Sequence, residues 1–77
     1  MSEVLVVDDE PSILEFLEVL LSKHGHQVRT APSVEAATKA LTASVPDLVI
    51  TDFRIGKQSG LDVVKAARAL SMPPEVI

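Results

Sequence analysis

The sequence predicts an α/β fold in which helices cover a parallel β-sheet. Short apolar runs rich in β-branched residues alternate with longer segments whose apolar residues recur at helical spacing. This alternation is typical of parallel strands joined by right-handed crossover helices. The composition agrees, because 47% of the 77 residues are hydrophobic and a sheet covered on both faces needs apolar strands.

The chain is predicted to begin with a strand, a helix and a second strand. Val4–Val7 is an apolar run bounded by acidic residues, as expected of a buried strand. Pro11 fits the first turn of a helix, and apolar residues recur at helical spacing over 13–21. Gly25 then ends the helix, and Gln27–Thr30 forms the second strand.

A second helix and a third strand follow. Ser33 is expected to cap this helix, whose inner face carries four apolar residues. These residues are Val34, Ala37, Ala40 and Leu41. The Ser-Val-Pro sequence at 44–46 ends the helix, and Asp47–Thr51 forms the third strand.

A third helix and the start of a fourth strand complete the pattern. After a loop at 52–60, the helix is predicted at 61–70, with Leu61, Val64, Ala67 and Leu70 facing inward. Glu75–Ile77 begins a fourth strand. Because no helix follows to cover this strand, the 77 residues are expected to be part of a longer domain.

The composition argues against several classes of protein. A net charge of −4 disfavours nucleic-acid binding, which needs a basic face. The absence of cysteine excludes a disulfide, a thiolate zinc site and a thiol nucleophile. The apolar runs are too short to cross a bilayer, and the first residues lack the basic start of a signal peptide. We therefore expect a cytoplasmic protein without a membrane partner.

Acidic residues follow two of the predicted strands at the point where each strand ends. Asp8 and Asp9 follow the first strand, and Asp52 follows the third. In a flavodoxin-like sheet with the strand order 2-1-3-4-5, strands one and three are neighbours, and ligands bind beyond their carboxyl ends. We therefore expect the three carboxylates to converge at one edge of the sheet.

Converging carboxylates repel one another unless a cation offsets their charge or one of them is protonated. Two unit charges about 4 Å apart cost roughly 1 kcal/mol in water and about 4 kcal/mol at an effective dielectric constant of 20. Mg2+ suits such a site because it binds carboxylate oxygens together with phosphate oxygens and water. A carboxylate can also attack phosphorus and form an aspartyl phosphate. The acids therefore suggest phosphoryl transfer onto the protein itself.

A simpler interpretation is that these acids only cap helices. Asp9 or Glu10 could cap the first helix, where the positive end of the helix dipole favours a carboxylate. Capping explains Asp52 poorly, because eight residues separate it from Leu61, where the next helical pattern starts. The metal-binding hypothesis accounts for all three aspartates.

Two separated motifs carry a resemblance to a known family. The first is VVDDEP at 6–11, and the second is TD at 51–52, followed by SGL at 59–61. In order and spacing these motifs resemble the receiver domain of two-component response regulators. The resemblance extends from Glu3 to Ile77, so 1–77 is expected to be a partial receiver domain that ends at the start of its fourth strand.

The resemblance implies a function and a set of site residues. Asp52 corresponds to the phosphoacceptor, which takes a phosphoryl group from a sensor histidine kinase or a phosphotransfer protein. Asp9 corresponds to the acid that binds Mg2+ directly, and Asp8 to the acid that acts through a water molecule. Asp52 and the backbone carbonyl of Arg54 complete the metal site, and Gly60 opens the third helix. Such a domain is not a conventional enzyme, but it assists its own phosphorylation and dephosphorylation.

Two departures from the family pattern are visible. Gly56 stands where the family usually has proline, which should loosen the loop after Asp52. The Ser or Thr at the end of the fourth strand and the Lys at the end of the fifth, which complete the family's switch, lie outside the 77 residues.

Two other functions are alternatives to this one. An interaction module without phosphoryl chemistry could pair with a second copy through an uncovered sheet edge. A phosphatase of the haloacid dehalogenase type needs Asp-x-Asp after the first strand, which Asp8-Asp9-Glu10 does not provide.

His24 and His26 flank a turn and are expected to be solvated or to interact with a helix end. Phe16 is expected to pack within its helix, and Phe53 to close the loop beside Asp52.

Overall fold

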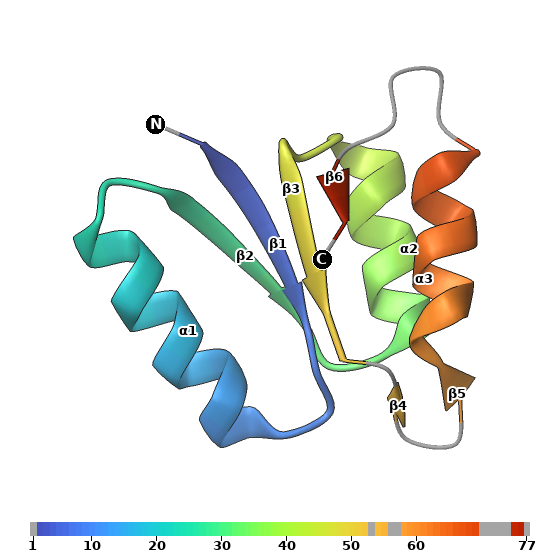
Figure 1. Ribbon diagram of the computed structural model, residues 1–77, viewed down its shortest axis with the longest axis horizontal. Coiled ribbons are helices and arrows are strands. Elements are labelled where there is room, and N and C mark those ends of the chain that lie inside the picture. The colour runs from blue at the N-terminus through green and yellow to red at the C-terminus, as the bar shows by residue number, and fades with distance from the viewer. Residues whose placement is uncertain (1, 53, 56–57, 70–74, 77) are drawn as a thin grey trace.

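The computed structural model describes residues 2–52, 54–55, 58–69 and 75–76, and in it the main sheet has four parallel strands. The strands are β1 (Glu3–Val7), β2 (Gln27–Ala31), β3 (Leu48–Thr51) and β6 (Glu75–Val76). Their order is β2-β1-β3-β6, which is the predicted 2-1-3-4 arrangement of a flavodoxin-like sheet. β1 therefore lies between β2 and β3 (Figure 1).

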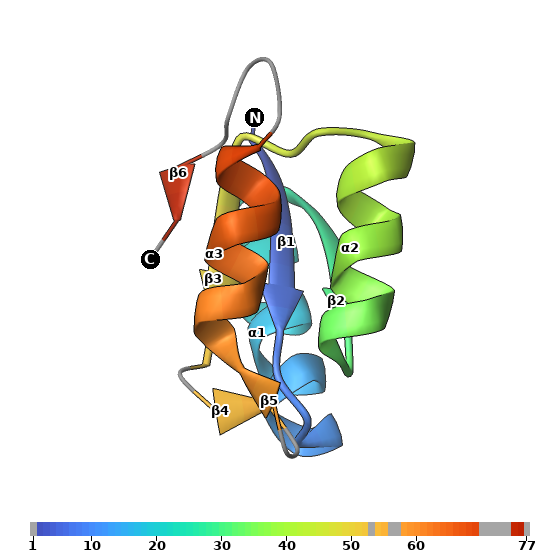
Figure 2. The same ribbon diagram turned by 90° about the vertical axis from the view of Figure 1, so that its right-hand side faces the viewer.

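Three helices cover the sheet on its two faces. They are α1 (Pro11–Lys23), α2 (Val34–Ala43) and α3 (Gly60–Arg68). Figures 1 and 2 show α1 on one face and α2 beside α3 on the other. In the described part of the chain, no helix is long and apolar enough to cross a membrane.

The main core lies between the sheet and the pair of helices α2 and α3. Leu5 and Val7 of β1 belong to it, together with Val49 of β3, and all three are at most 1% exposed. Successive strand residues face opposite sides of a sheet, so Val4 and Val6 lie on the face that carries α1, where they are also buried. β1 is thus buried on both faces, which explains its continuous apolar sequence.

The helix ends largely follow their local sequence signals. The Ser33 hydroxyl accepts a hydrogen bond from the Ala36 amide at 3.1 Å, so Ser33 caps α2 as predicted. Gly25 has φ of +85°, a conformation that glycine adopts without strain, and it follows the end of α1. Glu10 occupies the cap position of α1, but its side chain makes no capping hydrogen bond.

The prediction of the inner face of α3 was wrong in part. Val63 and Ala67 are fully buried, whereas Leu61 is 54% exposed and Val64 is only half-buried. Val63 and Ala67 are four positions apart and so lie on one side of α3, and both belong to the core cluster that includes Ala37 of α2. Leu70 lies outside the described residues.

The prediction for Phe16 was also wrong, because this side chain is 62% exposed. In α1 the residues that face the sheet are Leu14, Leu17 and Leu21, and each is half-buried. Phe16 lies on a different side of the helix, because one residue turns an α-helix by about 100°. The helical spacing therefore identified an apolar helix but not which of its apolar residues would be covered.

A small hairpin replaces part of the predicted loop after β3. It consists of β4 (Arg54–Ile55) and β5 (Gln58–Ser59), which pair antiparallel and lead directly into α3. Strands of two residues have no periodic pattern by which a sequence could reveal them. The predictions for Phe53 and Gly56 stay untested, because both residues lie outside the described part of the chain.

Arg29 of β2 connects the sheet edge to the end of α2. Its guanidinium donates hydrogen bonds to the carbonyls of Ala40 at 3.0 Å and Ser44 at 2.6 Å. The Ala40 carbonyl also accepts a hydrogen bond from the Ser44 amide at 3.1 Å, whereas the Ser44 carbonyl lies at the helix end, where the helix itself supplies no amide. A cation also interacts favourably with the negative end of the helix dipole.

We predict that Arg29→Met lowers the free energy of unfolding by about 1–2 kcal/mol, because two charge-assisted hydrogen bonds are lost. Urea denaturation followed by far-UV circular dichroism measures this change. Lys39→Met is the matched control, since its ion pair with Glu35 at 3.7 Å is highly exposed and should contribute less than about 0.5 kcal/mol. Equal losses in the two variants would contradict a stabilising role for Arg29.

Candidate metal centre

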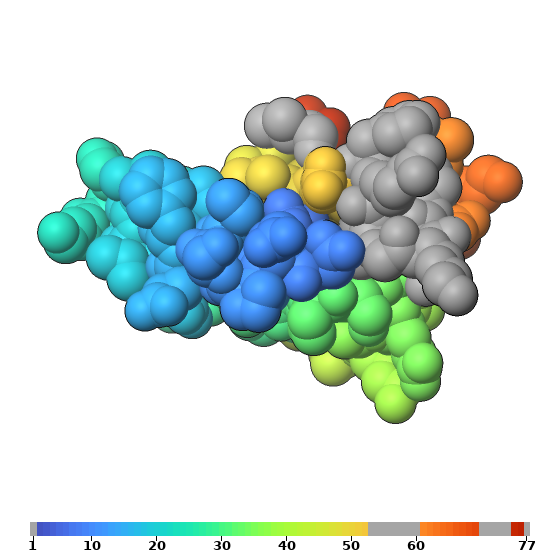
Figure 3. Space-filling view, turned by 90° about the horizontal axis from the view of Figure 1, so that it is seen from below, coloured from blue at the N-terminus to red at the C-terminus, as the bar shows by residue number. Residues whose placement is uncertain are grey.

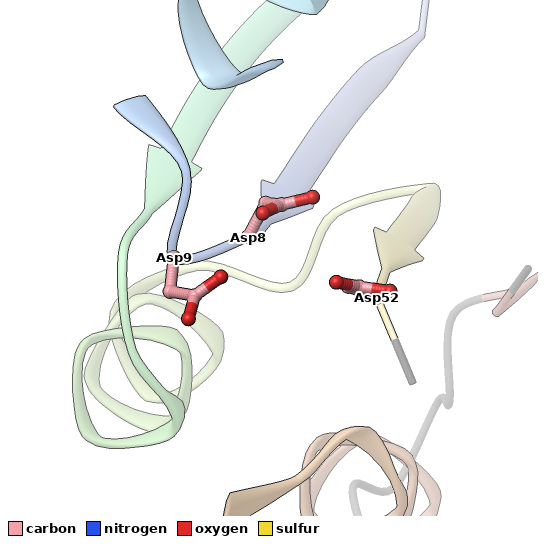
Figure 4. A group of neighbouring side chains, drawn as sticks. All are labelled: Asp8, Asp9 and Asp52. Carbon is pink, nitrogen blue, oxygen red and sulfur yellow. The ribbon is translucent and has the colours of Figure 1, made fainter. Parts of the chain in front are cut away.

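Three aspartates meet at the carboxyl ends of β1 and β3. One carboxylate oxygen from each of Asp8, Asp9 and Asp52 lies within 4.8 Å of the other two. Figure 4 shows Asp8 and Asp9 on the segment that leaves β1, with Asp52 across from them at the end of β3. Residues that are 43 or 44 positions apart in the sequence are thus brought together, as the strand order predicted.

Backbone hydrogen bonds of the sheet hold this arrangement. The Asp8 amide donates to the Ala31 carbonyl at the end of β2, and the Asp52 amide donates to the Val7 carbonyl at the end of β1, each at 3.1 Å. Each bond continues the parallel pairing one residue beyond the strand. The spacing between Asp8 and Asp52 is therefore set by the pairing of neighbouring strands rather than by a loop.

The Asp8 carboxylate also shapes the turn that leads into α1. One of its oxygens accepts a hydrogen bond from the Glu10 amide at 2.9 Å. Aspartate often bonds to the backbone two residues further along in this way, which stabilises a turn. Asp8 is half-buried, whereas Asp9 and Asp52 are exposed and accessible from solvent.

The carboxylate oxygens suit a small divalent cation. Oxygens bound to one Mg2+ lie 2.0–2.1 Å from the ion, so neighbouring ligand oxygens are roughly 3 Å apart and opposite ones roughly 4 Å apart. The three carboxylate oxygens lie within 4.8 Å of one another, near enough for the same cation to attract all three. A cation would also relieve the mutual repulsion of the carboxylates. The chemistry of these ligands therefore fits Mg2+, bound directly or through water.

The other residues of the predicted site lie close by in the chain. Arg54 begins β4, two residues after Asp52. Gly60 is the first residue of α3, as expected of a glycine that opens this helix. Thr51, which belongs to the TD motif at 51–52 but had no predicted role, donates a hydrogen bond from its hydroxyl to the Asp52 carbonyl at 3.1 Å.

The two histidines lie away from the aspartates, after the far end of α1. The Nδ1 atom of His24 is 2.9 Å from the Leu20 carbonyl, which is one of the last acceptors of this helix. His24 thus interacts with a helix end, as the sequence suggested.

The sequence matches a protein-family model. The model of the response regulator receiver domain matches residues 4–77. Among characterised relatives, the transcriptional regulatory protein KdpE of Mycobacterium tuberculosis is 39% identical over all 77 residues, which span 34% of its length. The alkaline phosphatase synthesis transcriptional regulatory protein PhoP of Bacillus subtilis is 39% identical over 66 residues, which cover 86% of this chain and 28% of PhoP.

Solved structures lead to the same family. A response regulator receiver domain protein from Clostridium thermocellum is 32% identical, with a TM-score of 0.89 over 99% of this chain and 62% of that one. The response regulator TrrA of Thermotoga maritima, solved in complex with Mg(2+)-BeF, is 37% identical, with a TM-score of 0.88 over 99% of this chain and 66% of TrrA. The chain therefore belongs to the response regulator receiver domain family of two-component signalling.

Proposed function

We propose that Asp52 accepts a phosphoryl group in a reaction that requires Mg2+. The observation that carries this proposal is the convergence of the carboxylates of Asp8, Asp9 and Asp52 within 4.8 Å. A solvent-accessible aspartate beside two further acids combines a nucleophile with the ligands for a divalent cation. The Mg(2+)-BeF complex of TrrA, which is 37% identical, supports the metal part of the proposal.

In this proposal each residue has a distinct role. Asp9 and Asp52 bind Mg2+ directly, Asp8 acts through a water molecule, and the backbone carbonyl of Arg54 is a further ligand. When bound, Mg2+ neutralises the negative charge that otherwise repels an incoming phosphoryl group. Asp8 additionally keeps its position through the hydrogen bond from the Glu10 amide.

The proposed donor is a phosphohistidine on a sensor histidine kinase or a phosphotransfer protein. A carboxylate oxygen of Asp52 forms a bond to phosphorus while the bond between phosphorus and the imidazole nitrogen breaks. The electron pair of the broken bond stays on the imidazole, which leaves as a neutral ring after taking up a proton. The chain is then an acceptor that assists this transfer and the later hydrolysis of its own acyl phosphate.

An interaction module that forms a homodimer through the sheet edge, without phosphoryl chemistry, is not favoured. That function requires the fold but gives no reason for three acids to converge at the ends of β1 and β3. Like charges at this distance reduce stability unless a ligand offsets them. The acidic cluster is better explained by a function that uses it.

We predict that Mg2+ stabilises the chain and that Asp9→Asn removes most of this effect. At about ten times its Kd, Mg2+ should raise the free energy of unfolding by about 1.4 kcal/mol, because it binds the folded state. Thermal unfolding in a series of Mg2+ concentrations measures the effect as a rise in Tm of several degrees. Without Mg2+, Asp9→Asn should be slightly more stable than the native chain, because one repelling charge is gone.

The control for this experiment is Glu15→Gln, which also removes one negative charge but lies on α1 outside the cluster. It should keep the full Mg2+ effect. If Asp9→Asn and Glu15→Gln respond to Mg2+ alike, the aspartates do not form the metal site.

We predict that phosphoramidate with Mg2+ adds a single phosphoryl group to the chain. Phosphoramidate contains a nitrogen–phosphorus bond, as phosphohistidine does, so it tests the acceptor without a partner protein. Intact-mass spectrometry should detect the adduct in the native chain and not in Asp52→Asn. Asp47→Asn is the matched control, because Asp47 precedes the same strand and its carboxylate accepts a hydrogen bond from the Glu3 amide, at the other end of the sheet. An adduct that persists in Asp52→Asn would contradict the assignment of the acceptor.

A further inference from the structure

Thr51 is a polar residue at a place in the sheet where its neighbours are apolar. It is paired with Val7 of β1, which in turn is paired with Ala31 of β2. Residues paired in this way point to the same face of a sheet. Val7 and Ala31 are each 1% exposed and belong to the main core, whereas Thr51 is half-buried. Valine has nearly the same shape as threonine, so packing alone does not explain the hydroxyl of Thr51.

This hydroxyl has a specific partner, the backbone carbonyl of Asp52, to which it donates a hydrogen bond at 3.1 Å. A hydroxyl that is partly withdrawn from water needs such a partner, because an unsatisfied polar group is unfavourable. Threonine is branched at Cβ and has few side-chain rotamers, so β3 holds the hydroxyl in a defined place. The bond therefore restricts the direction of the Asp52 carbonyl relative to the strand.

Hydrogen bonds thus hold the backbone of Asp52 on both of its sides. Its amide donates to the Val7 carbonyl at 3.1 Å, and its carbonyl accepts from Thr51, also at 3.1 Å. Because each peptide unit is planar, the directions of these two groups set the φ and ψ angles of Asp52. The backbone angles of a residue in turn limit its side-chain rotamers. The two bonds therefore restrict where the Asp52 carboxylate lies.

The place of this pair in the fold makes such restriction useful. Figure 3 looks onto the carboxyl edge of the sheet, where the end of β3 reaches the surface beside the segment that follows β1. Asp52 is exposed there, opposite Asp8 and Asp9. Thr51 is the last residue of β3, so it is the last side chain of the strand that can act on the backbone of Asp52.

We propose that Thr51 is a positioning residue for Asp52, acting through the hydrogen bond from its hydroxyl to the Asp52 carbonyl. The proposal rests on the function proposed above, in which the Asp52 carboxylate is the nucleophile and a ligand of Mg2+. A nucleophile must meet phosphorus in line with the leaving group, so a small change in its direction lowers the rate. In this proposal Thr51 acts only through Asp52 and is not a catalytic residue.

Thr51→Val and Thr51→Ser test the proposal, because valine keeps the branched shape without the hydroxyl and serine keeps the hydroxyl without the branch. With saturating Mg2+, Thr51→Val should take up phosphoryl from phosphoramidate about fivefold more slowly than the native chain, as expected for the loss of one ordinary hydrogen bond. Thr51→Ser should recover most of the rate. Thr42→Val is the matched control, because the Thr42 hydroxyl also donates to a backbone carbonyl, that of Thr38 at 2.9 Å, but does so within α2. It should leave the rate unchanged.

Thermal unfolding of the same variants separates positioning from a loss of stability. Valine favours strands more than serine and adds apolar surface beside a buried row, so Thr51→Val should have the higher Tm of the two. The order of the Tm values should therefore be opposite to the order of the rates. A residue that only stabilised the fold would make the Tm and the rate fall together.

NMR tests the positioning without any phosphoryl chemistry. Three-bond couplings to the carboxyl carbon of Asp52 report its side-chain rotamer in the absence of Mg2+ and of a phosphoryl donor. They should indicate one dominant rotamer in the native chain and in Thr51→Ser, and an average over several rotamers in Thr51→Val.

The outcomes distinguish this inference from the function on which it rests. Equal rates in Thr51→Val and the native chain overturn the positioning role, and so does a rate in Thr51→Ser as low as that in Thr51→Val. Couplings that are the same in all three chains overturn it as well. If the native chain takes up no phosphoryl group, or if Asp52→Asn still does, the proposed function fails, and the couplings alone then decide whether Thr51 positions Asp52.

Discussion

The pairing of β1 with a neighbour on each side is the constraint on which the rest of the structure depends. Because β2 and β3 both run parallel to β1, their carboxyl ends reach the same edge of the sheet. The amides of Asp8 and Asp52 prolong this pairing by hydrogen bonds to Ala31 and Val7. The acidic cluster is therefore a direct product of the sheet, and changing the strand order would separate its members.

Much of this arrangement could be predicted from local patterns and one topological rule. Strand β1 is recognisable as an apolar run rich in valine, and α2 by its serine cap and its row of small apolar residues. The convergence of the aspartates then follows from the order of strands in doubly wound sheets. The metal roles proposed for Asp8, Asp9 and Arg54 come from the family resemblance, because spacing alone does not assign ligands.

The features that the sequence did not predict all depend on contacts between distant segments. Val63, rather than Leu61, is buried because the side of α3 that carries Val63 and Ala67 packs into the core. Phe16 is exposed because the sheet contacts a neighbouring side of α1, and the apolar pattern of that helix is wide enough to allow either side. The hairpin of β4 and β5 is too short to have a pattern at all.

The burial of β1 on both faces has a consequence for how long the acidic site keeps its shape. Local opening of a protein begins where few contacts hold the backbone, such as chain ends and exposed turns. β1 is paired on both sides and covered on both faces, so it should be among the last segments whose amides exchange with solvent. Asp8 and Asp9 directly follow this strand, so their attachment to the sheet should persist through local openings elsewhere in the fold.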